Sequence, residues 1–385
     1  MFLRLAASVL APDDLRPATE CCYRPCMIAI DKQQIAGAEV ALPCAELEAT
    51  LAFFRDRLGF QLQAIFPADA PAVAVLAGHG LRLRLERSGE GAPGCIRLLC
   101  REPEAVAGGE RVLTAPNGTR VELVEAETPM VLPPLKPELV ISRASGEGAF
   151  DAGRAGMLYR DLIPSRLGGR FIASHIRIPT GGPVPDYVHF HKIRFQMIFC
   201  RTGWVRLVYE DQGPPFVMEA GDCVLQPPQI RHRVLESSAG LEVIEIACPA
   251  VHETFAENVM TLPTARLDPS RDFGGQRFLW HVAAKARWQL WRVPGFECRD
   301  TGMGEATKGL AAARVVRPKG ASDMPRATHA REFQFFFLLD GSATLICSGT
   351  HPLASGDALT IPAGLSYAMS ECSDQLSLLE VTLPD

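Results

Sequence analysis

Three histidines are spaced so that they can bind one metal ion. His189 and His191 lie two residues apart in an extended run, and His232 returns from a distant segment, GDCVLQPPQIRH. Because side chains at i and i+2 of a strand project from the same face, the first two imidazoles can reach one ion. Gln196 lies shortly after them. We expect one divalent metal ion between His189, His191 and His232, with Gln196 beside them, because imidazole is a common ligand of such ions.

A closed β-structure must bring these distant side chains together. Residues 157–250 and 290–385 are both rich in short runs with period-two alternation, such as WVRLVYED and SATLICSG, separated by Gly and Pro turns. This pattern is typical of an all-β barrel or sandwich. The two blocks also align with each other, with Arg160-Asp161 laid over Arg299-Asp300. A duplicated β-barrel explains both observations.

Proline-rich and unassigned segments divide the rest of the chain. Four prolines between Pro129 and Pro137 exclude regular structure and predict a linker, and DFGGQRFLWHV between the β-blocks has no assignable element. The predicted order is an N-terminal extension (1–36), a small α+β domain (37–128), a linker (129–156), a first barrel (157–250), a connector (251–289) and a second barrel (290–385).

The histidine segments resemble the two short motifs of the cupin superfamily. The matching residues are Gly182, His189, His191, Gln196 and Gly203 for the first motif and Gly221, Pro227 and His232 for the second. The resemblance implies a mainly β fold with two cupin barrels of the jelly-roll, or double-stranded β-helix, type. It also implies these metal ligands: His189, His191, Gln196 and His232. Gln196 stands where most cupins have Glu, and its amide can either bind the ion or lie behind the ligands.

The amide in place of a carboxylate changes the charge of the centre. A glutamate would cancel one charge of a divalent ion, whereas three imidazoles and an amide leave both, which favours a small anionic, chelating substrate. The resemblance implies a metal-dependent oxygenase acting on an organic acid, enol or phenol with O2, with Fe(II) favoured and Mn, Ni, Cu or Zn as alternatives. Two other interpretations stay open. One is a non-redox isomerase or lyase, and the other is a non-catalytic binding or sensory bicupin.

The second barrel keeps the scaffold but loses the histidines. Counting back from Gly341 places Gln334, His329 and Ala327 at the positions of the first motif, and Tyr367 falls where the last histidine should be. Because two of the three imidazoles are missing, we expect no tightly held metal there.

The N-terminal block predicts a β-α-β-β-β order. IAGAEVALP reads as a strand, CAELEATLAFFRDRLGF as a helix ending at Gly59, and QLQAIF, AVAVLAG and LRLRLER as strands. The block resembles one module of the vicinal oxygen chelate, or glyoxalase-like, superfamily, followed by a second module too short to contain its helix. That resemblance implies Glu39, Glu86 and Glu122 as metal candidates, but charged strand residues usually face water, so we favour exposed carboxylates.

Composition excludes some partners and indicates a compartment. The 39 Lys and Arg, the 44 Asp and Glu and the absence of a basic run make nucleic acid an unexpected partner, and no run of 18 apolar residues suggests a membrane span. The 12 cysteines are scattered without C-x-x-C spacing, so we predict free, mostly buried thiols and a cytoplasmic location. We also expect a homodimer. Arg194 and Glu245 could lie beside the metal ligands, although surface or strand-edge positions are favoured.

Overall fold

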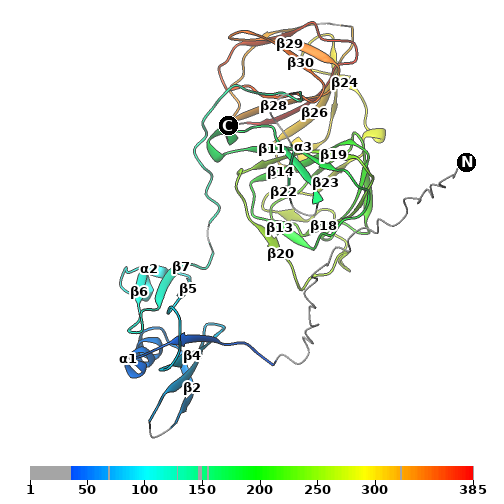
Figure 1. Cartoon of the computed structure of the whole chain (residues 1–385). Coiled ribbons are helices and arrows are strands. Elements are labelled where there is room, and N and C mark those ends of the chain that lie inside the picture. Colours follow the sequence, from blue (N-terminus) through cyan, green and yellow to red (C-terminus); the bar gives the residue numbers. More distant parts are fainter. Residues whose placement is uncertain are drawn as a thin grey trace, which may run out of the picture. The chain divides into compact units, whose positions relative to one another are not determined.

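The computed structural model describes residues 36–67, 70–127, 129–145, 150–153, 156–320 and 323–384. They form two compact units that divide between Pro129 and Met130 (Figure 1). The predicted N-terminal extension, apart from residue 36, lies outside the described residues. No helix in the described ranges has the length and apolar character needed to cross a membrane.

The N-terminal unit begins with the predicted βαβββ order. Its elements are β1 (Val40–Pro43), α1 (Leu47–Ala52), the π-helical turn η2 (Phe53–Arg57), β2 (Gln61–Phe66), β3 (Val73–Gly78) and β4 (Leu81–Glu86). The sheet order is β1-β4-β3-β2, with β1 parallel to β4. Gly59 adopts a φ of 73°, which lets the chain leave the helix as expected. Phe54 is fully buried and belongs to a core of apolar side chains from the helix and the sheet.

The second half of this unit forms its own small sheet. Its elements are β5 (Cys95–Cys100), α2 (Pro103–Val106), β6 (Val112–Thr114) and β7 (Arg120–Glu125), in the sheet order β5-β7-β6. The prediction that this part contains no helix is wrong, because Pro103 starts a short helix at a position where its missing N–H costs nothing. The order of elements agrees with the glyoxalase-like resemblance, but membership of that family stays a prediction.

The first barrel consists of a large and a small sheet whose facing side chains form one core. The large sheet contains β23 (Leu279–His281), β17 (Cys223–Leu225), β14 (Phe195–Thr202), β19 (Leu241–Cys248), β11 (Ile172–Ile178), β10 (Leu158–Asp161) and β9 (Asp151–Ala152), in this order. The small sheet contains β16 (Phe216–Glu219), β15 (Trp204–Tyr209), β18 (His232–Ser237), β13 (His189–His191) and β20 (Thr254–Ala256), with β12 (Gly182–Pro183) beside β18.

The second barrel repeats this plan. Its large sheet runs β8 (Val140–Ser142), β31 (Ala358–Thr360), β28 (Phe333–Asp340), β33 (Ser377–Leu383), β26 (Ala312–Pro318), β25 (Phe296–Asp300) and β24 (Gln289–Leu290). Its small sheet contains β27 (Met324–Ala327), β32 (Tyr367–Ser370), β29 (Ser342–Ile346) and β30 (Thr350–Ala354). The strand order of its large sheet matches that of the first barrel position by position, and β10 and β25 end at the aligned residues Asp161 and Asp300. The predicted duplication is therefore confirmed.

The two predicted intervening segments take part in the barrels. Within the expected linker 129–156, β8 pairs with β31 of the second barrel and β9 pairs with β10 of the first. Within the expected connector 251–289, β20 pairs with β13, and β23 pairs with β17. The unassigned run in that connector contains β21 (Asp272–Phe273), β22 (Gln276–Arg277) and β23. Short strands like these carry too few residues for a clear alternation pattern.

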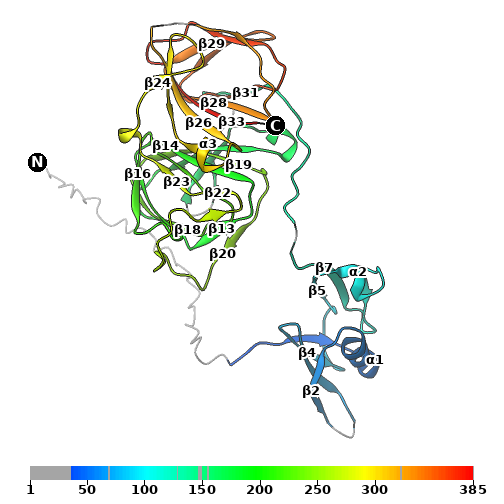
Figure 2. The same cartoon turned by 180° about the vertical axis from the view of Figure 1, so that it is seen from behind.

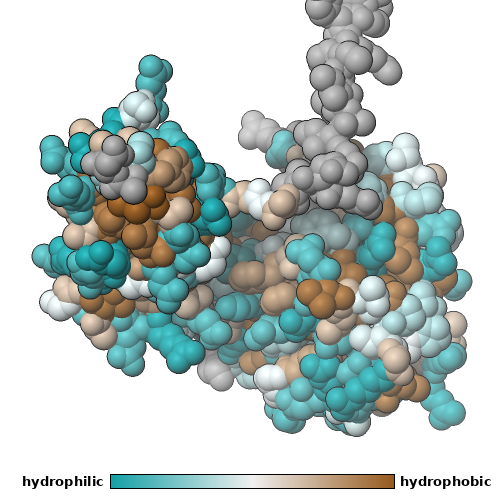
Figure 3. Space-filling model, turned by 90° about the horizontal axis from the view of Figure 1, so that it is seen from below, coloured by the Kyte–Doolittle hydropathy of each residue, from teal (hydrophilic) through white to brown (hydrophobic). Residues whose placement is uncertain are grey.

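The large sheets of the two barrels pack against each other. Figures 1 and 2 both show β26 and β28 next to β14 and β19. The contact is apolar and includes the stacked rings of Phe171 and Phe333, whose centroids are 4.1 Å apart. All cysteines in the described ranges are free, and most are buried, as predicted. Apolar residues also reach the surface of both units in the view of Figure 3.

Candidate metal centre

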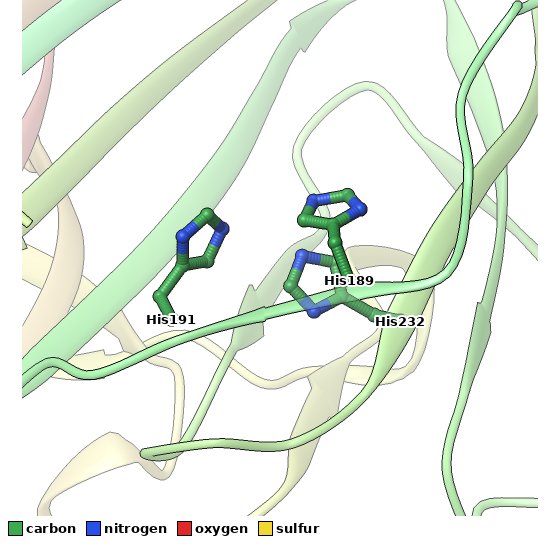
Figure 4. Close-up of side chains that lie close together, drawn as sticks. All are labelled: His189, His191 and His232. Carbon is green, nitrogen blue, oxygen red and sulfur yellow. The ribbon is translucent and has the colours of Figure 1, made fainter. Parts of the chain in front are cut away.

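The three predicted histidines meet on the small sheet of the first barrel. Strand β13 carries His189 and His191, and the antiparallel strand β18 places His232 directly opposite His189. All three are buried, and one ring nitrogen from each lies within 4.8 Å of the others. Figure 4 shows the three rings gathered together. In the described ranges, they form the one group of His, Cys, Asp or Glu side chains with this geometry.

Backbone carbonyls fix which ring nitrogen of each histidine carries hydrogen. The Nδ1 atoms of His189, His191 and His232 lie 2.7, 3.3 and 3.0 Å from the carbonyl oxygens of Tyr187, Glu253 and Ile230. Because a carbonyl oxygen can only accept, each Nδ1 donates, and the lone pair is left on Nε2. Metal-binding histidines are commonly oriented by such a hydrogen bond on the other nitrogen. The donor set therefore fits a divalent ion.

Gln196 lies in the same cavity and is linked to Glu245. Its side chain is buried on β14, and Nε2 donates to Oε1 of Glu245 on β19 at 2.5 Å. The amide Oε1 of Gln196 is then a buried acceptor without a hydrogen-bond partner in the described residues. Such an acceptor is costly unless something binds it, and a metal ion could do so. Direct metal binding by Gln196 remains a prediction.

The other two charged candidates are separated by the fold. Glu245 lines the cavity, which corrects our preference for a strand-edge position. Arg194 instead pairs with Glu332 at 2.7 Å, linking the two barrels. Period-two alternation does not say which face of a strand points into the barrel. Only the pairing of β14 with β19 therefore decided that Glu245 faces the cavity.

The histidines open into a largely apolar cavity of about 450 Å³. Its apolar lining is Met157, Tyr159, Ile172, Ile176, Ile178, Ile198, Val205, Leu207, Met218, Val234, Leu241 and Val243. Glu245 is its carboxylate, and no Arg or Lys of the described residues lines it. Among the described residues, a ligand in this cavity therefore meets no cationic side chain of Arg or Lys.

Further polar residues of the cavity were missed in the sequence. Gln226 places Nε2 2.8 Å from Nε2 of His232, and Tyr209 stacks on the same ring at 5.5 Å between centroids. Burial raises the pKa of Tyr209, so its hydroxyl keeps its proton. Alternation with Val205 and Leu207 could have placed Tyr209 inside the barrel. His252 and Thr254 come from the predicted connector, which contained no signal for them.

In the second barrel, an ion pair lies at the equivalent position. Gln334 donates to Glu380 at 3.2 Å, which repeats the Gln196–Glu245 pair of the first barrel. Here, however, Arg292 binds the fully buried Glu380 through two hydrogen bonds of 2.8 and 2.5 Å. His329 hydrogen-bonds the Ile361 carbonyl through Nε2 and the Arg331 N–H through Nδ1. The Arg292 guanidinium supplies the positive charge at this position. That the second barrel holds no tightly bound metal stays a prediction.

The three carboxylates proposed for the N-terminal unit do not converge. Glu39 pairs with Arg82, and Glu86 accepts a hydrogen bond from Arg84. Glu122 lies in the other sheet of the unit, where it pairs with Arg97 and Arg120. They form no metal-binding group within the described residues. We favoured exposed carboxylates, whereas these three side chains are only about one quarter to one third exposed and are paired with arginines.

Comparison with known proteins supports the cupin assignment. Residues 313–382, from β26 into β33, match the family model of the cupin domain. The match falls on the second barrel, whose strand order the first barrel repeats. Among curated proteins, none matches the chain.

Several solved structures have a similar fold at low sequence identity. A mutant of oxalate decarboxylase from Bacillus subtilis is 12% identical, with 66% of this chain and 78% of that chain covered and a TM-score of 0.47. The protein Ylba from E. coli is 12% identical, with 66% and 94% covered and a TM-score of 0.47. Salicylate 1,2-dioxygenase from Pseudaminobacter salicylatoxidans is 14% identical, with 66% and 86% covered and a TM-score of 0.46. Likeness at this level carries no inference about activity.

Proposed function

We propose that this chain is a metal-dependent cupin oxygenase that holds one divalent ion at His189, His191 and His232. The observation that supports the proposal most directly is the convergence of one ring nitrogen from each of three buried histidines at a largely apolar cavity. Fe(II) is favoured because the substrate and O2 must both bind and react at the ion. A bound ion would supply Lewis acidity and, if redox-active, electrons for O2.

The protein's own residues orient and shield this chemistry. The three carbonyls that accept from Nδ1 hold the imidazoles in the metal-binding tautomer. Glu245 holds the amide of Gln196, so that Oε1 is available inside the cavity. The Ile, Val, Leu and Met side chains exclude water, which strengthens electrostatic interactions there.

The lining also indicates the substrate class. We propose a chelating enolate, phenolate or carboxylate with one negative charge and an apolar body. Its chelating end would lie at the histidines, and its body against the aliphatic wall. A compact dicarboxylate fits poorly, because its second charge would be desolvated near Glu245 without an Arg or Lys among the lining residues.

Oxygen uptake tests the proposal. Protein purified without chelators is loaded with Fe(II) and offered an apolar β-diketone, an aromatic hydroxy acid and oxalate. We expect O2 consumption with one of the first two, no consumption with oxalate, and loss of activity in His232→Ala. Product formation without O2 consumption would instead identify an isomerase or lyase. Binding without product from any of the three would identify a non-catalytic binding protein.

A further inference from the structure

A second hollow lies between the two barrels, on the other side of β14. Gln196 and Ile198 on this strand face the metal cavity, whereas Phe199 and Arg201 line an open groove of about 500 Å³. The groove also receives Arg299 from β25 of the second barrel. Two guanidinium groups and an indole, that of Trp288, thus line one hollow outside the proposed metal centre.

The duplicated barrels provide an internal comparison for Arg299. Arg160 occupies the equivalent position in the first barrel and donates to two carbonyls, those of Gly356 at 2.6 Å and Arg143 at 2.8 Å. Arg299 repeats the first of these contacts, donating to the Gly221 carbonyl at 3.1 Å. In the described residues, no second acceptor hydrogen-bonds it. The Nε atoms of both arginines are buried without a hydrogen-bond partner there.

A local turn explains why the second acceptor is missing. Ala144 and Ala283 occupy equivalent positions, because each donates its N–H at 2.7 Å to the aspartate after the contacted glycine, Asp357 or Asp222. The equivalent of the Arg143 carbonyl is therefore that of Val282. This oxygen instead accepts from Lys285 N at 3.1 Å, within the 3-10 turn η5 (Ala283–Lys285).

The charge of Arg299 is also left without a close carboxylate. It forms no ion pair within the described residues, and the carboxylate of Asp222 accepts from the N–H groups of Ala283 and Glu219. Burial raises the pKa of the nearby Cys223 thiol to about 12, so this group is neutral. Burial also lowers the pKa of Arg299, although the charge of Asp222 opposes this shift, and the guanidinium lies 5.6 Å from the centre of the Trp288 ring.

The rest of the groove adds one opposing charge and several polar residues. Arg201 pairs with Glu242, which also pairs with His175 and Arg177. Arg201 also donates to the Ser355 hydroxyl at 3.1 Å. Asp340 is the carboxylate of the groove, but it is exposed and accepts from the Gly341 N–H. Ser377 and Thr202 also line the groove. An anion would therefore meet two arginines among polar residues.

We propose that this groove binds a small oxyanion, a carboxylate or phosphate group, against the guanidinium of Arg299, with Arg201 in the same lining. The anion would take the place of the carbonyl that Arg160 contacts in the first barrel. Guanidinium groups pair well with such oxyanions because their donors form a planar fork. This site is independent of the proposed metal centre and of the reaction there.

Titration of the metal-loaded full chain with inorganic phosphate and, separately, with acetate tests the proposal. Ionic strength is held constant with chloride, and binding is followed by calorimetry and by tryptophan fluorescence, which Trp288 should report. We expect saturable binding of at least one anion, and at least about tenfold weaker binding in Arg299→Gln, because a charge-assisted hydrogen bond is lost. The two arms show whether phosphate or carboxylate is preferred.

Two further variants keep the test decisive. Arg314→Gln removes the same charge from the neighbouring strand, where Arg314 pairs with Asp300 outside the groove, and should leave affinity unchanged. If Arg299→Gln does not fold, Arg299→Lys keeps the charge but loses the fork and should still weaken binding. The proposal is overturned if neither anion binds, or if affinity is the same in the native protein and in the Arg299 variants. The second outcome would also place a bound anion elsewhere, for example at the metal.

Discussion

At the residue scale, the roles of the histidines follow from which ring nitrogen is engaged. In the first barrel, Nδ1 of each histidine donates to a carbonyl, which leaves the lone pair on Nε2, and the Gln226 amide lies 2.8 Å from Nε2 of His232. In the second barrel, backbone groups hydrogen-bond both ring nitrogens of His329. The same residue type is therefore a proposed metal ligand in one setting and a structural group in the other.

This difference predicts the metal content of two variants. His232→Ala should lose most of the bound metal, because two imidazoles remain where a stable site needs three or four ligands. His329→Ala should keep about one ion per chain. Elemental analysis of protein purified without chelators measures both. Full occupancy in His232→Ala would show that the ion binds elsewhere, and a halved content in His329→Ala would reveal a second site.

Gln196→Glu separates metal affinity from substrate affinity. If the side chain lies against the ion, a carboxylate should bind the metal at least as tightly as the amide does. It should also weaken the binding of an anionic chelator by about 1–3 kcal/mol. The new carboxylate would also face Glu245, which Gln196 now contacts at 2.5 Å, so the metal-free protein should lose stability. Metal titration, chelator binding and thermal unfolding measure the three effects.

The double variant Gln196→Glu with Glu245→Gln is the matched control. It restores one amide and one carboxylate across the pair, so the stability of the metal-free protein should recover. The gain in metal affinity should remain, because the charge still lies at position 196. Unchanged metal and chelator affinities in both variants would mean that residue 196 points away from the ion.

At the element scale, the barrels are closed by strands from outside their own sequence blocks. β8 precedes the first barrel in the chain but completes the large sheet of the second, and β23 takes the equivalent place in the first. The prolines of the expected linker end before β8 begins, which leaves Val140–Ser142 able to pair. Covering the edge of β31 in this way protects it from pairing with other chains.

Disrupting β8 should therefore destabilise the second barrel. Ile141 packs on the core of that barrel, so Ile141→Asp should lower the free energy of unfolding by about 2 kcal/mol. Val131→Asp is the control, since Val131 is 75% exposed, and it should have little effect. Urea unfolding measures both. Equal stability of the two variants would mean that β8 contributes little to the sheet.

At the scale of the whole molecule, a charged cluster borders the apolar contact between the barrels. Glu242 accepts hydrogen bonds from His175, Arg177 and Arg201, which lower its pKa from 4.5 to about 2, with the His175 bond as the largest cause. Burial lowers the pKa of His175 from its ordinary value of 6.5. Both groups thus favour their deprotonated forms in the folded protein.

The two shifts predict that acid weakens the fold. For a lowered pKa, the stabilisation is present above the ordinary value and is lost as the pH falls toward the folded value. Stability should therefore decline below pH 6.5 through His175 and further between pH 4.5 and about 2 through Glu242. Urea unfolding over this range should show a loss of about 2 kcal/mol from Glu242, whose side chain is 16% exposed.

Glu242→Gln provides the comparison, since its stability should not decline between pH 4.5 and about 2 through this group. Glu236→Gln, which removes a half-buried partner of Arg206, should keep this part of the decline. If the free energy of unfolding depends on pH in the same way in the native protein and in Glu242→Gln, the acid-induced loss of stability does not come from Glu242.

Sequence periodicity and spacing were sufficient to predict the convergence of the three histidines and the duplication of the barrel. Period-two alternation is local, so it places His189 and His191 on one face whatever the strand pairs with. Tertiary structure alone decided which strands are neighbours, and hence the pairing of Gln196 with Glu245, the arrival of His252 from the connector and the position of β8. It also decided that no Arg or Lys of the described residues reaches the cavity. These features depend on contacts between residues far apart in the chain, which packing selects and local pattern does not encode.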